Sequence, residues 1–445
     1  MFMTKSLRWI LVAALSGFLF GFDTVVISGA NLPIKELWST SPFFHGFFIM
    51  SMALWGTVIG ALLGAYPTNT IGRKKTLTWI GVFFFLSALG SALAMDPYTF
   101  SFFRFIGGLA VGVSSVAAPI YISEISSPKN RGSLGVLYQF SLVFGILIAF
   151  FSNYLLTGFD GANDWRWMLG VEAIPALLYF LLTLNIPDSP RWQILFQKND
   201  TAALATLEIM YVDKEKAQAF LNKIKTAEPE HQTQKSGVAN LSSKAMVLAF
   251  FVAFFNQLSG INFILYYAPE ILELAGFATK ESLFNSVFIG LTNIIFTFAG
   301  LLLIDKLGRK QLLIIGSLGY IVSLTGVSLA FYIQSNPMWI SLFIFGFIAS
   351  HAIGQGTIIW VFISEIFPNR LRALGQSFGT GIHWIFAALI TLIGPYVIDL
   401  YQNNPWPIFS FFAFMMVLQL IFAIFMMPET KGKSLEDINL IIDKN

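Results

Sequence analysis

Cysteine is absent from the 445 residues, and histidine occurs only four times. Without cysteine the chain has no disulfides, no thiol catalysis and no thiolate metal sites. The histidines (His45, His231, His351 and His383) lack metal-ligand spacing, and the sequence contains no GxGxxG, GxxxxGK or HExxH motif. We therefore expect neither an enzyme nor a protein with a cofactor, a metal or a nucleic-acid partner.

Charged residues are scarce as well. They make up 11% of the chain and hydrophobic residues 56%, whereas a soluble globular protein has about 25% charged residues. The mean hydropathy is +0.71, and apolar runs near the ~20 residues that span a bilayer recur from end to end. This composition predicts an all-α integral membrane protein with little mass outside the lipid bilayer.

The apolar runs indicate twelve transmembrane helices. We place them at about 9–31, 44–67, 76–95, 99–122, 133–156, 166–186, 245–268, 282–304, 311–333, 338–362, 374–397 and 407–427. With the N-terminus in the cytoplasm, 23 of the 27 Lys and Arg residues fall on the cytoplasmic side, while Lys35, Arg166 and Lys280 fall outside and Arg104 lies within a span. The positive-inside rule then predicts a multi-pass protein of the cell inner membrane with both termini cytoplasmic.

The first apolar run has an alternative interpretation as a cleaved signal peptide. Lys5 and Arg8 would be its basic region, and 11–20 its apolar core. The apolar stretch continues past Asp23 to Ala30, and the internal repeat described below requires it. We therefore interpret it as the first transmembrane helix.

A polar segment at about 188–244 separates the sixth and seventh runs. Two short amphipathic helices are expected there, at 201–210 behind Asn199 and Asp200 and at 214–224 behind Asp213, and 226–243 is expected to be flexible. The predicted organisation is an N-terminal six-helix half (1–187), a cytoplasmic helical linker (188–244), a C-terminal six-helix half (245–430) and a cytoplasmic tail (431–445).

The two halves repeat the same loop motifs. The matches are NTIGRK at 69–74 with DKLGRK at 305–310, the seven-residue spacing of Glu124 and Arg131 with that of Glu365 and Arg372, and PDSPR from Pro187 with PETK from Pro428. The offsets between matched motifs are 236, 241 and 241 residues. Two similar six-helix units should pack about a pseudo-twofold axis along the membrane normal, with the substrate site at their interface.

The charged residues of these motifs all lie on the predicted cytoplasmic side. Each exposed ion pair contributes only ~0–1 kcal/mol, but a set of pairs between helices could bias a two-state equilibrium. We therefore expect a cytoplasmic gate made of Arg73, Glu124, Arg131, Arg309, Glu365 and Arg372. The alternative, which we favour for any single lysine, is that these charges only determine topology.

Longer motifs extend over nearly the whole chain. They are GFDTVVISG at 21–29, RFIGG at 104–108, PDSPRW at 187–192, QLSGIN at 257–262 with Tyr266-Tyr267, Trp360 with SEIFP at 364–368, and PETKG at 428–432. Together they resemble the sugar-porter family of the major facilitator superfamily, and most of all its bacterial monosaccharide–proton symporters. The resemblance implies two pseudo-symmetric six-helix halves that import a hexose or pentose with a proton by alternating access, in a protein that we expect to be monomeric.

Two other functions are compatible with these motifs. One is facilitative sugar uniport through the same fold, and the other, with less support, is a transporter-like sugar sensor. The chain also departs from the family pattern at Asn69, at Asn256 in place of a first Gln, at Thr357 in place of a frequent Pro, and at His383 before Trp384. Most of these changes touch the expected pocket, so the identity of the sugar stays open.

Three charged residues, Asp23, Arg104 and Glu172, lie inside apolar spans. A charge at the bilayer centre costs ~2.5–3.5 kcal/mol on insertion scales, which makes such residues candidates for function. Counting from the ends of the spans at ~1.5 Å per residue places all three in the outer half of the membrane. The resemblance implies that Asp23 binds the proton and Arg104 pairs with it, because facilitators carry Asn at the helix 1 position; Glu172 is expected to assist. A permanent structural ion pair is the alternative.

Amides and aromatic rings within the spans suit a sugar, because an amide supplies a donor and an acceptor and an aromatic plane covers the sugar ring. The predicted sugar-binding residues are Gln139, Asn256, Gln257, Asn262, Tyr266, Asn293, Trp360, His383, Trp384 and Phe20. The matching positions contact or line the sugar cavity in the family that the chain resembles. The alternative for a lone intramembrane amide is a bond between helices, worth ~0.6 kcal/mol.

The remaining expectations concern three histidines and one glutamine. His351 and Gln355 precede Trp360 and could reach the pocket, and His383 could titrate as a second proton site. His45 is expected in an exposed loop or at a helix start.

Overall fold

The computed structural model describes residues 3–126, 131–211, 213–232, 243–367 and 372–432. Every regular element in these ranges is helical, which confirms the all-α prediction. The same ranges contain eleven single candidate membrane spans, and Pro42–Met50 with Met52–Leu63, bent by 42°, form a twelfth. This number agrees with the twelve apolar runs of the sequence.

The N-terminal half contains spans 1 to 6. Its elements are α1 (Met3–Leu37); the bent span 2 of α2 (Pro42–Phe44), the π-helix η1 (His45–Met50) and α3 (Met52–Leu63), followed by α4 (Ala65–Thr70); α5 (Arg73–Leu93); α6 (Pro97–Ile125); α7 (Arg131–Leu156); and the short η2 (Gly161–Asn163) with α8 (Asp164–Gly170) and α9 (Ala173–Thr183).

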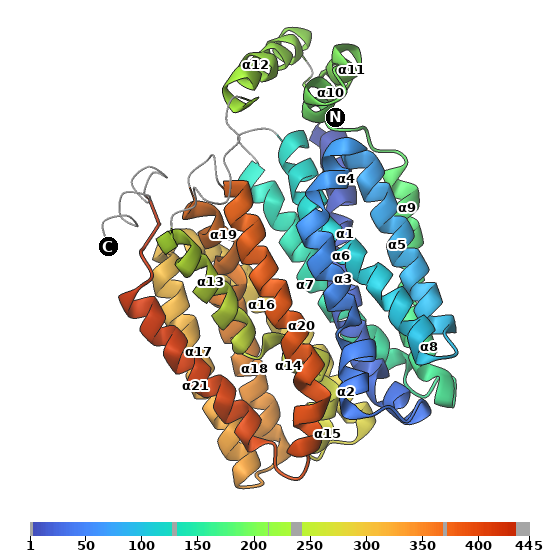
Figure 1. Cartoon of the computed structure of the whole chain (residues 1–445), viewed down its shortest axis with the longest axis vertical. Helices are drawn as coiled ribbons and strands as arrows, with labels where there is room; N and C mark the ends of the chain where they lie inside the picture. The colour runs from blue at the N-terminus through green and yellow to red at the C-terminus, as the bar shows by residue number, and fades with distance from the viewer. Residues whose placement is uncertain (1–2, 127–130, 212, 233–242, 368–371, 433–445) are drawn as a thin grey trace.

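The C-terminal half contains spans 7 to 12. Its elements are α13 (Ser243–Leu258), α14 (Ile261–Tyr266) and α15 (Ala268–Leu274) in span 7; α16 (Thr279–Leu307); α17 (Arg309–Tyr332); α18 (Pro337–Ile353) and α19 (Gln355–Glu365) in span 10; α20 (Arg372–Leu400); and α21 (Trp406–Phe425). Figure 1 shows the two halves side by side, with the starts of α1 and α5 and the end of α21 at one end of the bundle.

The linker contains three helices, α10 (Pro190–Leu195), α11 (Asp200–Met210) and α12 (Lys214–Gln232), at the same end of the bundle as the start of α1 (Figure 1). The two predicted helices are confirmed, and Asn199 caps α11 as expected by accepting a bond from the Ala202 N–H at 3.0 Å. The sequence did not predict α10, and α12 continues well into the stretch expected to be flexible. The rest of that stretch, 233–242, lies outside the described residues, as does most of the predicted tail.

Helix α6 begins where local chemistry dictates. Asp96 accepts hydrogen bonds from the N–H groups of Tyr98 and Thr99 at 2.9 and 3.0 Å, and Pro97 fills the first helical position, where no N–H is needed. The start of the helix is therefore fixed, and Arg104 follows about two turns into the span.

The internal repeat is visible in backbone conformation. Gly72 before α5 has φ 95° and Gly308 before α17 has φ 93°, values that favour glycine. The Asp188 carboxylate accepts the Arg73 N–H at 3.0 Å, and the Glu429 carboxylate accepts the Arg309 N–H at 2.9 Å. In each half, an acidic side chain from the end of the last span thus caps the third helix of that half.

The predicted gate residues pair within each half. Arg73 forms two bonds of 2.9 Å with Glu124, and Arg309 forms bonds of 3.2 and 2.8 Å with Glu365. These pairs hold the helices of one half together, so the seven-residue spacing did not identify the partners, and a lock between the halves stays a prediction. The side chains of Arg131 and Arg372, at the starts of α7 and α20, lie outside the described part of the chain.

We expect Gly72→Ala to destabilise the protein. A non-glycine residue at positive φ costs about 1–3 kcal/mol, and a Cβ here would also lie 2.5 Å from Asp188 Oδ2 and 2.9 Å from the Trp192 ring. The thermal midpoint of the detergent-solubilised protein measures the effect. Gly158→Ala is the matched control, because Gly158 has φ 83° but nothing within 4 Å of the added Cβ. Equal losses in the two variants would mean that the contact with Asp188 adds nothing.

Two spans of the C-terminal half are interrupted. Gly260 has φ 86° and ψ 13° between α13 and α14, and Gly354 has φ −85° and ψ −105° between α18 and α19. The corresponding spans of the N-terminal half, α1 and α6, are each one continuous helix. The breaks release backbone groups and change the direction of the chain where the polar residues of spans 7 and 10 lie.

Candidate functional site

The predicted pair of Asp23 and Arg104 is formed. Arg104 Nη1 donates to Asp23 Oδ1 at 2.6 Å, and Arg104 Nη2 donates to the Asp23 carbonyl at 3.1 Å. Both residues are buried, with exposures of 1% and 2%. Because a buried charge is tolerated only when it is paired and hydrogen-bonded, each residue requires the other in this state.

Glu172 lies beside this pair. It is buried, its charge lies near enough to interact with Asp23 and Arg104, and its Oε1 atom has no hydrogen-bond partner among the described residues. Gly107 makes room for the pair, since a Cβ there would lie 3.3 Å from Asp23 Oδ1 and would overlap the Ser87 hydroxyl. Neither Gly107 nor Ser87 was among the predicted site residues, although Gly107 stands inside the RFIGG motif.

Three of the predicted sugar-binding amides form one chain of hydrogen bonds. Asn262 Nδ2 donates to Gln257 Oε1 at 2.9 Å, and Gln257 Nε2 donates to Asn256 Oδ1 at 2.9 Å. Gln257 Nε2 also lies 3.2 Å from the ring nitrogens of His383. Asn256 in turn donates to Gln355 Oε1 at 3.4 Å. The break at Gly260 brings Asn262 back towards Gln257.

Aromatic rings continue from this cluster across the two halves. The Trp360 and His383 ring centroids lie 4.9 Å apart, His383 and Trp384 4.8 Å, and Trp384 and Phe20 5.7 Å. Phe20 belongs to α1, so this row joins the N-terminal half to α19 and α20. Trp360 is 36% exposed, whereas the other three are nearly buried. The Trp384 indole N–H is buried without a partner in the described structure, so it is a free donor.

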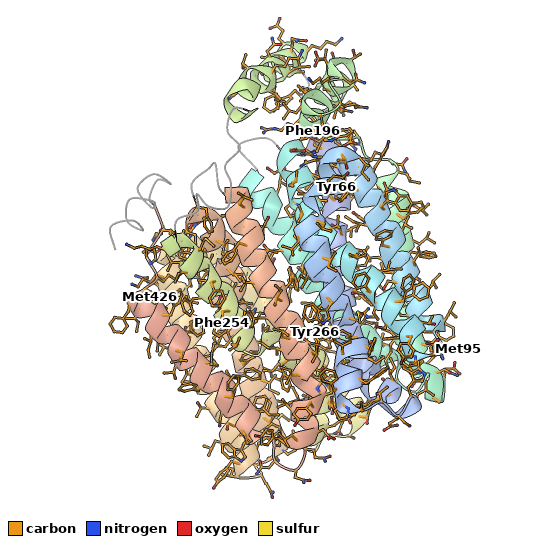
Figure 2. The ribbon with its side chains drawn as sticks, in the orientation of Figure 1. Tyr66, Met95, Phe196, Phe254, Tyr266 and Met426 are labelled. Atoms are coloured by element: carbon orange, nitrogen blue, oxygen red, sulfur yellow. The ribbon has the colours of Figure 1, made fainter. Side chains whose placement is uncertain are left out.

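The remaining predicted sugar-binding residues lie outside this chain of amides and row of rings. Tyr266 is buried at the centre of the molecule (Figure 2), on α14 where this helix contacts α1, and its hydroxyl lies near the Asp23–Arg104 charges. Asn293 is buried and accepts a bond from the Thr297 hydroxyl at 3.3 Å. Gln139 is half-buried on α7. Neither Asn293 nor Gln139 joins the amide chain, and His351 bonds the Tyr320 hydroxyl at 2.5 Å instead.

A second polar cluster joins the halves at the end of the bundle opposite the linker. Asn31 Nδ2 donates to Glu270 Oε2 at 2.7 Å, and Asn31 Oδ1 lies 2.8 Å from His45 Nε2. His45 Nδ1 bonds the Thr40 hydroxyl at 2.8 Å, and Lys35 Nζ lies 3.9 Å from Glu270. His45 starts η1, which is one of the two positions expected for it. It is also fully buried, because both of its ring nitrogens find partners.

Sequence similarity to known proteins extends over nearly the whole chain. Residues 9–441 match the sequence model of the family described as sugar (and other) transporter. The chain is 37% identical over 438 residues to an arabinose-proton symporter of Bacillus subtilis, covering 96% of this chain and 92% of the relative. It is 32% identical over 470 residues to the D-xylose-proton symporter of Escherichia coli, covering 97% and 94%.

Solved structures agree with the sequence matches. The inward-open structure of the xylose transporter XylE from E. coli superposes with a TM-score of 0.86 at 30% identity, covering 99% of this chain and 100% of XylE. XylE bound to 6-bromo-6-deoxy-D-glucose gives 0.79 at 30% identity, covering 99% of each chain. The chain is therefore a membrane transporter with the major facilitator fold, and it belongs to the sugar (and other) transporter family.

Proposed function

We propose that this protein is a secondary active transporter that imports a monosaccharide, a pentose or a hexose, together with a proton. The observation that carries the proposal is the buried Asp23–Arg104 pair. Tyr266 lies near the charges of this pair and stands on α14 with Asn262, which belongs to the amide cluster of the other half. The relatives named as arabinose-proton and D-xylose-proton symporters favour the same substrate class.

The pair supplies the coupling. When Asp23 is ionised, its bond to Arg104 holds α1 against α6. Proton binding to Asp23 removes the charge that Arg104 needs, so the bond weakens and the two helices can shift. Tyr266 lies near this pair and is four residues from Asn262. Because α14 contacts α1, a shift of α1 would reach the sugar-binding amides through α14. Glu172 is the neighbouring carboxylate that can accept a proton or stabilise Arg104 when Asp23 is neutral.

The sugar would occupy the junction of the halves. Asn262, Gln257 and the Trp384 indole N–H would bond its hydroxyls, and the Trp360, His383, Trp384 and Phe20 rings would cover its face, with Gln139 and Asn293 facing it from α7 and α16. The contact of Asn31 with Glu270 joins the two halves at the end of the bundle opposite the linker. The TM-score is also higher with the inward-open structure of XylE than with the structure bound to 6-bromo-6-deoxy-D-glucose. We therefore assign this conformation to the cytoplasm-facing state.

We also propose the domain boundaries of the chain and its orientation in the membrane. The two six-helix halves are 1–187 and 245–430, joined by the linker 188–244 and followed by the tail 431–445. Both termini and the linker lie in the cytoplasm, the protein spans the cell inner membrane, and it acts as a monomer in the lipid bilayer.

Uptake into proteoliposomes tests the function. With an imposed inside-negative potential and an inward pH gradient, labelled D-xylose, L-arabinose or D-glucose should accumulate above the external concentration. One proton moving down 100 mV supplies ~2.3 kcal/mol, which supports more than tenfold accumulation at ~1.4 kcal/mol per tenfold. A protonophore should reduce the ratio to one. Equilibration without accumulation in any condition would identify a uniporter instead.

A further inference from the structure

The amide chain of the sugar site does not end at Asn256. Asn256 Nδ2 donates to Gln355 Oε1 at 3.4 Å, Gln355 Nε2 donates to Gln419 Oε1 at 2.9 Å, and Gln419 Nε2 donates to Ser317 Oγ at 2.8 Å. Ser317 then donates to the Leu313 carbonyl at 2.7 Å. The chain thus extends from α14 through α13, α19 and α21 to α17, and it ends on a backbone acceptor.

This end point fixes the direction of every bond. The Leu313 carbonyl can only accept, and the Ser317 hydroxyl has one proton to donate, so Ser317 must accept from Gln419. Gln419 therefore turns its NH₂ group to Ser317 and its oxygen to Gln355. Gln355 repeats the arrangement and turns its oxygen to Asn256. Each amide passes the same orientation to the next.

The order is maintained because the chain is buried. Gln355, Gln419 and Ser317 are completely buried, and Asn256 and Gln257 are nearly so. In a buried site, turning one amide around would set two NH₂ groups or two oxygens against each other, and each unsatisfied buried group costs about 1–3 kcal/mol. The terminal bond of Ser317 is thus transmitted to the residues at the sugar.

We propose that Ser317, Gln419 and Gln355 are positioning residues that set the polarity of the sugar-binding amides and thereby the choice of sugar. In the structure, every amide of the chain donates in the direction of Ser317. Asn262 therefore donates one N–H to Gln257 Oε1, and its Oδ1 remains free to accept a hydrogen bond from a sugar hydroxyl. In the reversed polarity Asn262 would give its oxygen to Gln257 and present only N–H donors. The inference rests on the proposed sugar transport, because it names what selects among the sugars.

Removing the terminal hydroxyl should make the two polarities nearly equal in energy. A site built for one pattern of donors and acceptors rejects a mismatched sugar because buried groups are left unpaired. A chain that can reverse adapts to either pattern, so Ser317→Ala and Gln419→Met should narrow the difference in affinity between sugars. Ser317→Thr keeps the hydroxyl and should keep the selectivity.

The experiment measures dissociation constants of D-xylose, L-arabinose and D-glucose from the fluorescence of the purified protein, whose Trp360 and Trp384 border the site. We expect the ratio between the strongest and weakest binder to fall at least fivefold in Ser317→Ala and in Gln419→Met. Ser328→Ala is the matched control. Ser328 also lies on α17 and also bonds α21, through the Ser410 hydroxyl at 2.7 Å and the Trp406 carbonyl at 2.9 Å, so its ratio should stay within twofold.

The outcomes separate the two proposals. If the unmodified protein binds none of the three sugars, the proposed function fails before any variant is made. If it binds them and Ser317→Ala weakens all three equally, the chain only stabilises the fold and the positioning role is refuted. An unchanged ratio in Gln419→Met refutes it as well, because that variant removes two bonds of the chain.

Discussion

Asp23→Asn should abolish accumulation of sugar, so that the internal to external ratio falls from more than tenfold to about one. The amide oxygen of asparagine can still accept the 2.6 Å bond from Arg104 Nη1, but it cannot bind and release a proton near neutral pH. Sugar binding and reorientation of the halves should therefore continue without a driving force. The measurement is labelled-sugar uptake in energised proteoliposomes, with counterflow exchange measured in the same preparation.

The Asp23→Asn protein is also expected to retain counterflow exchange, which requires that it still folds with Arg104 buried. Removing one partner of a buried ion pair costs about 3–5 kcal/mol when the other charge is left alone. Here the amide dipole still faces Arg104, and the carboxyl group of Glu172 lies near enough to interact with it, so the protein should fold and exchange should stay within about threefold of normal. Asp96→Asn is the control, because Asp96 caps the same helix that carries Arg104 and asparagine is an equally good cap.

Accumulation that survives Asp23→Asn and remains sensitive to a protonophore would place the proton elsewhere. Glu172 is then the next carboxylate to replace, with Glu172→Gln. Loss of both accumulation and exchange, in a protein of normal abundance, would instead favour the structural ion pair that the sequence left open.

Gly46→Leu should stop the transport cycle, with uptake and exchange both reduced at least tenfold. Gly46 lies on η1 in the N-terminal half, and a Cβ there would overlap the backbone carbonyl of Leu392 on α20 in the other half. A backbone carbonyl inside a helix cannot rotate away, so the two halves must separate at the end of the bundle opposite the linker. The variant should therefore remain open to the outside, and sugar should still bind from that side.

The absence of native cysteine gives this prediction a direct reporter. Asn31→Cys places one thiol at the junction, where Asn31 is 1% exposed and contacts Glu270. In the Gly46→Leu background a membrane-impermeant maleimide added outside should label it several times faster than in the Gly46 background. Gly135→Leu is the control, because nothing lies within 4 Å of a Cβ at Gly135. Unchanged labelling together with normal exchange would mean that α20 adapts locally.

The fold was largely predictable because lipid simplifies the problem. Apolar runs of the right length must become helices in a bilayer, and the loop motifs repeated with offsets of 236 and 241 residues, so the spans and their two halves followed. Interruptions within spans 7 and 10 did not follow. Gly260 and Gly354 stand among many glycines, and nothing local distinguishes a glycine that breaks a helix from one that packs against a neighbour.

The site was predictable where rarity carried information. Charged groups within lipid are expensive, so Asp23, Arg104 and Glu172 stood out, and the structure brings the three together. The partners of polar uncharged residues did not stand out. Gln419 and Ser317 are ordinary residues on apolar helices, and their bonds to spans far away in sequence depend on how α17, α19 and α21 pack. The burial of His45 was not predicted for the same reason, because burial of a histidine depends on partners that only tertiary structure supplies.

The interruptions at Gly260 and Gly354 make the sugar-binding spans of the C-terminal half more flexible than the proton-binding spans of the N-terminal half. Gln257 and Asn262 lie on either side of the break at Gly260, and Gln355 follows the break at Gly354, whereas Asp23 and Arg104 lie on continuous helices. A sugar bound by residues on both sides of a break would restrict the bending of the span there. Amide hydrogen exchange should accordingly slow around residues 258–262 and 353–357 when sugar is added, and stay constant along α1 and α6.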